Sequence, residues 1–67
     1  MSKLSFVSFC VEYYADYINQ PSEKVYDLFK REKVLDMLRD DYEDLHGMSM
    51  EYMMQFIDRY LGGDQAC

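Results

Sequence analysis

The stretch LSFVSFCVEYYADYI, residues 4–18, decides the fold class because its apolar side chains recur with the period of an α-helix. At about 100° per residue, those side chains spread over an arc of roughly 200°. Ser5, Ser8, Glu12 and Asp16 fill the narrow polar remainder. A surface helix needs an apolar stripe only a little wider than about 100°. The stretch therefore predicts a helix with more apolar surface than one neighbouring helix can cover.

Proline and glycine divide the rest of the chain into three more segments of helical length. We expect helices at residues 23–31, 33–44 and 50–61. Ser22 and Ser49 are the expected N-caps, because a serine hydroxyl can accept a free backbone N–H at the start of a helix. Gly62 lies where a glycine is expected, just past a helix end. The alternation of apolar and polar residues that is typical of a β-strand is not found.

These segments predict an all-α fold, a compact bundle of three to four short helices. A chain of 67 residues is long enough for one domain only. We expect residues 1–61 to form a single helical domain and residues 62–67 to form a disordered C-terminal tail.

The expected third helix contains one misfit. Asp41 projects from its apolar face beside Val34 and Leu45, where a charge without a partner is costly to bury. Either the helix loosens near Asp40, or Asp41 lies at the rim of the buried face.

The charge balance restricts the class of partner. Thirteen acidic residues against seven basic ones give a net charge of −6. Nucleic acid and anionic membranes both favour a basic protein surface, so we expect neither as a partner. A hydrophobic content of 49% excludes intrinsic disorder, and no apolar run approaches the roughly 18 residues of a transmembrane span. Without a secretory leader, we expect a cytoplasmic protein in which Cys10 and Cys67 are reduced.

No residue pattern predicts catalysis, a metal site or a cofactor. His46 is the only histidine, and no Cys-x-x-Cys spacing occurs. Cys10 lies within the apolar arc and is expected to be a small core residue. His46 is expected to help finish the third helix by meeting its free carbonyls. The carboxyl groups of the acidic run at residues 40–44 are expected to lie in similar, solvated environments. Acid–base catalysis needs two acidic groups in contrasting environments, which push their pKa values apart. We therefore expect no enzymatic activity.

We expect instead a non-catalytic protein–protein interaction module. Tyrosine and methionine are enriched at protein interfaces, and this short chain has seven and six of them. The apolar arc of residues 50–61 is again roughly 200° wide, so part of both wide arcs should meet another chain. The expected partner-binding residues are aromatic anchors on these two helices with acidic residues at the rim, namely Tyr13, Tyr17, Tyr52, Phe56, Tyr60, Asp40, Asp41 and Asp44.

Two other interpretations stay open at this point. The wide arcs could close on themselves in a symmetric homodimer without a ligand. The acidic residues could instead mimic nucleic acid, as in some inhibitors, although they are concentrated on one helix. The acidic flank of the third helix is either a docking face for a basic partner or a solvated face.

Three motifs resemble a family of short bacterial proteins that is catalogued as a domain of unknown function. They are F-V-x-F-C-V-E-x-Y at residues 6–14, V-Y-x-L-F-K at residues 25–30, and V-L-D-M-L with Y-E-D-L-H across residues 34–46. Members of that family commonly carry a glycine or an aromatic residue near Glu32 and Lys33, and a threonine where this chain has Gly47. Their genes resemble companions of toxin-like genes, including ones similar to ADP-ribosyltransferases. The resemblance implies an antitoxin-like role with a basic toxin-like enzyme as partner.

Overall fold

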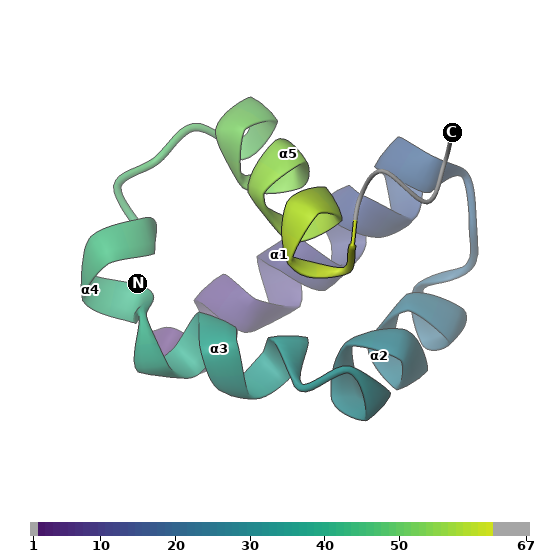
Figure 1. The fold of residues 1–67 in the computed structure, drawn as a ribbon, viewed down its shortest axis with the longest axis horizontal. Helices are drawn as coiled ribbons and strands as arrows, with labels where there is room; N and C mark the ends of the chain where they lie inside the picture. Colours follow the sequence, from purple (N-terminus) through teal and green to yellow (C-terminus); the bar gives the residue numbers. More distant parts are fainter. Residues whose placement is uncertain (1, 63–67) are drawn as a thin grey trace.

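The computed structural model describes residues 2–62, and every regular element in that range is an α-helix (Figure 1). The predicted all-α bundle is therefore confirmed. In chain order the helices are α1 (Lys3–Ile18), α2 (Ser22–Arg31), α3 (Val34–Asp40), α4 (Tyr42–Leu45) and α5 (Met50–Tyr60). Of the tail expected at residues 62–67, only Gly62 is among the described residues, and residues 63–67, including Cys67, lie outside them.

Helix α1 is the centre of the bundle, because α2, α3 and α5 all pack against it. Figure 1 shows α5 crossing in front of α1, with α3 and α2 in the lower part of the view. The face that α1 turns toward these helices carries six buried side chains: Phe6, Val7, Cys10, Val11, Tyr14 and Ala15. They meet buried residues from every other helix, including Val25, Phe29, Val34, Leu38, Leu45, Met53 and Ile57. Cys10 is fully buried and unpaired, which confirms the prediction that it is a core residue.

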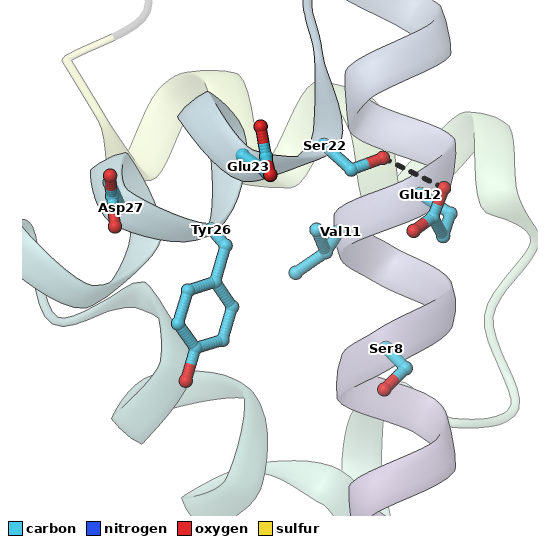
Figure 2. A pocket seen from close by; sticks show the side chains of 7 residues that line it. All are labelled: Ser8, Val11, Glu12, Ser22, Glu23, Tyr26 and Asp27. Atoms are coloured by element: carbon cyan, nitrogen blue, oxygen red, sulfur yellow. Dashed lines mark hydrogen bonds between the residues drawn. The ribbon is translucent and has the colours of Figure 1, made fainter.

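The turn between α1 and α2 depends on two residues with special backbone geometry. Asn19 takes a left-handed conformation with φ 57°, and the N–H of Gln20 donates to the Ala15 carbonyl at 2.9 Å, which closes the end of α1. Pro21 then precedes α2 in an extended conformation. The prediction of Ser22 as the N-cap is wrong, because Ser22 is already helical. Its hydroxyl donates to Glu12 Oε1 at 2.8 Å and so ties α2 to α1 (Figure 2).

The single helix predicted at residues 33–44 is also wrong. Lys33 has φ 64°, in the left-handed region that favours glycine, so the helix begins one residue later. The helix then ends at Asp40, and Asp41 (φ −100°, ψ 18°) separates α3 from α4. This break leaves Asp41 exposed while Val34 and Leu45 are buried. The misfit seen in the sequence is thus resolved by interrupting the helix, which avoids burial of an unpartnered carboxylate.

The side chain of His46 lies at the end of α4, and that of Ser49 lies at the start of α5. The cap predicted at Ser49 is confirmed, whereas His46, expected to finish one helix of residues 33–44, finishes the separate helix α4. His46 closes α4, where its Nδ1 lies 2.9 Å from the Tyr42 carbonyl oxygen. Its ring also stacks on the Tyr42 ring, with centroids 4.6 Å apart. Ser49 is the N-cap of α5, because its hydroxyl accepts the Tyr52 N–H at 3.1 Å. Gly62 follows α5 with φ 87°, a conformation that glycine adopts at little cost.

Candidate protein-binding surface

Large apolar side chains remain exposed on α1 and α5. Phe9, Tyr13 and Tyr17 follow one another at intervals of four residues along α1, and each is between 47% and 53% exposed. On α5 the same spacing relates Tyr52, Phe56 and Tyr60, of which the two tyrosines are exposed and Phe56 is half-buried. Residues four apart share one side of a helix, so each set forms a continuous stripe. The expected excess of apolar surface on these two helices is therefore present in the folded chain.

A surface groove runs between α1 and α5. It is lined by two tyrosines of α1, two methionines of α5 and three polar or acidic residues, namely Tyr13, Asp16, Tyr17, Met50, Glu51, Met54 and Gln55. Met54 is buried and Met50 half-buried, whereas Tyr13 and Tyr17 are about half exposed. We call this feature the α1–α5 groove. It offers an apolar lining with carboxylates at its edge.

Asp58 places a further negative charge next to this groove. The hydroxyl of Tyr14 donates to Asp58 Oδ1 at 2.6 Å, which joins the middle of α1 to the end of α5. Burial and the Asp58 carboxylate together raise the pKa of Tyr14 well above its ordinary value. The negative charge of Asp58 also raises the pKa of Tyr17, one turn further along α1. Both tyrosines therefore stay protonated at neutral pH, and the potential beside Tyr17 is negative.

Tyr52, Phe56 and Tyr60 form a second surface, which we call the α5 stripe. The rings of Tyr52 and Phe56 are nearly parallel, with centroids 6.1 Å apart. At about 100° per residue, this stripe lies on the opposite flank of α5 from Met50 and Met54, which line the groove. The two sets of aromatic residues predicted from the sequence thus border different sides of α5.

The predicted acidic rim lies in a third region. Asp40, Asp41 and Asp44 are all exposed at the junction of α3 and α4. Tyr42, between two of them, packs edge-on against Phe6 near the start of α1, with ring centroids 5.4 Å apart. Tyr13 lies seven residues further along α1, which is about 10 Å along the helix axis. The structure therefore does not bring these three aspartates to the edge of the α1–α5 groove.

The carboxylates beside the groove were missed by sequence reasoning. Asp16 and Glu51 fall on the polar stripes of their helices, so in the sequence they look like ordinary solvated residues. Asp58 bonds to a residue 44 positions away, and nothing in the sequence pattern signals that pairing. Only the crossing of α5 over α1 brings these groups to one surface.

A second pocket, between α1 and α2, is lined by two serines and three acidic residues together with Val11 and Tyr26 (Figure 2). Figure 2 shows the carboxylates of Glu12, Glu23 and Asp27 and the ring of Tyr26 around it. Within residues 2–62, no three acidic, histidine or cysteine side chains are grouped closely enough to hold a metal ion. The pocket is therefore acidic without the convergent ligands of a metal site.

Cys10 has the wrong environment for a nucleophile. Its side chain is 0% exposed, and burial raises the pKa of the thiol to about 12. A nucleophilic cysteine needs the thiolate form and access to a substrate, and Cys10 has neither at neutral pH. His46, the sole imidazole, is exposed and engaged with Tyr42.

The fold and these surfaces define a small helical protein with aromatic faces on two crossing helices. The chain belongs to the family described as "Protein of unknown function (DUF3791)", whose model matches residues 5–62. The predicted resemblance to a domain of unknown function is thereby confirmed. No curated protein and no solved structure gives a significant match. In the described part of the chain, none of the helices has both the length and the apolar character needed to cross a membrane.

Proposed function

We propose that this protein acts without catalysis, by binding another protein through the aromatic faces of α1 and α5. The observation that carries the proposal is the exposure of Phe9, Tyr13 and Tyr17 along one helix and of Tyr52 and Tyr60 along its neighbour. Single exposed apolar residues are common, but continuous rows of large aromatic side chains on neighbouring helices are typical of interaction surfaces. Tyrosine suits this use because its ring is apolar and its hydroxyl can stay hydrated.

The family resemblance supports an antitoxin-like role in the cytoplasm, with a basic toxin-like enzyme as partner. The net charge of −6 favours such a partner, because opposite charges speed association and exclude acidic competitors. Asp40, Asp41 and Asp44 are exposed and free to contribute to this long-range attraction. Their distance from the aromatic faces suits a steering role better than direct contact.

Quantitative affinity capture from cells of the native host tests this proposal. The bait is the full chain, and captured proteins are compared by mass spectrometry between the wild type and two surface variants, Tyr13→Ser/Tyr17→Ser and Tyr52→Ser/Tyr60→Ser. Tyr26→Ser is the matched control, because Tyr26 on α2 is 49% exposed but belongs to neither aromatic face. We expect the control to capture one partner in the same amount as the wild type. At least one face variant should capture that partner in an amount reduced by more than about tenfold.

Two results would contradict the proposal. Capture of the same proteins by the wild type and both face variants would show that the aromatic faces bind nothing specific. Sedimentation of the purified chain as a stable dimer, abolished by the same face variants, would show that the faces serve self-association instead.

A further inference from the structure

The α1–α5 groove has a composition that selects its occupant. Its apolar lining comes from Tyr13, Tyr17, Met50 and Met54, and carboxylates stand at its edge. Among the described residues that line it, none is basic. An apolar ligand would leave the carboxylates without a partner, and an acidic one would be repelled. The groove therefore complements a side chain with a long apolar stem and a positive end.

The carboxylates around the groove are not neutralised within the fold. In residues 2–62, ion pairs join Arg31 to Glu32 and Arg39 to Asp36, all outside the groove. Asp16 and Glu51 take part in neither pair. Asp58 accepts from a neutral donor, the Tyr14 hydroxyl, and belongs to neither ion pair, so its negative charge is not neutralised by a cation of the described residues. A cation in the groove would thus meet unpaired negative charge on both helices.

We propose, on the basis of the protein-binding function above, that the α1–α5 groove receives an arginine side chain from an amphipathic helix of the partner protein. Guanidinium is favoured over ammonium because it stacks on tyrosine rings and pairs with carboxylates through two hydrogen bonds. Tyr13 and Tyr17 supply the rings, and Asp16 and Glu51 supply the carboxylates. The methionines adapt to the aliphatic stem and to neighbouring apolar residues of the partner helix.

A second copy of this chain fits the groove poorly. In a two-fold symmetric dimer, the same patch would face itself, so the carboxylates of both grooves would be brought into one interface with no basic residue of the groove to pair with them. Each chain also carries a net charge of −6, which opposes self-association at low salt. A basic partner removes both penalties, and this charge complementarity decides between the two occupants.

The test uses the full ¹⁵N-labelled chain and two synthetic helical peptides of leucine and alanine. One peptide carries arginine on its polar face, and the other carries citrulline at the same positions. Citrulline keeps the shape of arginine and removes its charge. We expect saturable NMR shifts at residues 13–17 and 50–55, with the arginine peptide binding at least about tenfold more tightly at physiological salt.

Matched charge variants distinguish binding at the groove from general electrostatic attraction between the peptide and the acidic protein. Asp16→Asn/Glu51→Gln should abolish the advantage of the arginine peptide. Asp40→Asn/Asp44→Asn removes the same number of negative charges away from the groove, and we expect its affinity to stay within about twofold of the wild type. All four side chains are exposed, so both double variants should fold, which circular dichroism verifies.

The proposal is overturned if the two peptides bind equally, if neither binds, or if the two double variants weaken binding to the same extent. Shifts confined to the α5 stripe would also overturn it. None of these results affects the capture experiment, in which partner loss from Tyr52→Ser/Tyr60→Ser alone would support protein binding and reject the groove as its location.

Discussion

At the residue scale, the bond from Tyr14 to Asp58 joins α1 to α5 across 44 positions of the chain. Tyr14 is buried against Phe29, with ring centroids 5.3 Å apart, and its hydroxyl reaches across to α5. Replacement by phenylalanine keeps the ring and removes only the donor. The half-buried Asp58 carboxylate would then lose its partner, which costs about 1–3 kcal/mol.

The first prediction concerns the pH dependence of this contribution in Tyr14→Phe. The pKa of Tyr14 is raised in the folded chain, so its contribution is fully present below the unfolded value of about 10 and declines as pH rises toward the folded value. The stability difference between wild type and Tyr14→Phe should therefore be constant from pH 7 to 9 and shrink above about pH 10. Urea unfolding followed by circular dichroism measures it.

Tyr26→Phe is the control for this measurement, since Tyr26 is a 49% exposed tyrosine on α2, whereas the bond to Asp58 comes from Tyr14 on α1. A difference for Tyr14→Phe that grows above pH 10 would contradict the assignment. It would mean that the unfolded state, rather than the native one, holds the Tyr14 proton more tightly.

At the scale of single elements, the helices differ in which groups accept the free backbone N–H groups of their first turns. Helix α5 begins with a side-chain cap, because Ser49 accepts the Tyr52 N–H. Helix α2 begins after Pro21, with no side-chain cap, and the Pro21 carbonyl accepts the N–H groups of Lys24 and Val25. The two serines that look equivalent in the sequence therefore have different roles.

The second prediction compares these two serines. Ser49→Ala should destabilise the protein by about 1 kcal/mol, because it leaves an N–H of the first turn of α5 without its acceptor. Ser22→Ala removes only an exposed bond to Glu12 and should cost less than about 0.5 kcal/mol. Chemical denaturation of both variants under identical conditions tests the difference. Equal losses would indicate that Ser22 caps α2 after all.

At the scale of the whole molecule, one small core must hold five helices together. A chain of this length has a free energy of unfolding of only about 3–10 kcal/mol. Leu38, Phe29, Met53 and Ile57 are completely enclosed in that core, whereas the aromatic faces of α1 and α5 add little to it. Stability and binding therefore depend on different side chains of the same helices.

The third prediction compares neighbours on α5. Met53→Ala empties a fully buried position and should cost about 2–5 kcal/mol, enough to unfold much of the population. Tyr52→Ala changes a residue that is 42% exposed and should cost less than about 1 kcal/mol. Thermal melts by circular dichroism measure both. A loss for Tyr52→Ala as large as for Met53→Ala would show that the α5 stripe is part of the core.

The sequence by itself determined the helices, because helix formation depends on apolar periodicity and on local breakers. It located α1, α2 and α5 to within about one residue, and it identified Ser49 as a cap and Cys10 as a core residue. It also showed that Asp41 could not be buried in a continuous helix, although it left open whether the helix breaks there.

Only the tertiary structure decided which part of each wide apolar arc is covered. Helix α5 crosses α1 (Figure 1). This crossing helps to enclose Tyr14 and leaves Tyr13 and Tyr17 at the edge of a groove. It also pairs Tyr14 with Asp58 and separates the aromatic faces from Asp41 at the α3–α4 junction. Such placements depend on contacts between residues far apart in the chain, and a periodic pattern carries no information about the angle at which two helices cross.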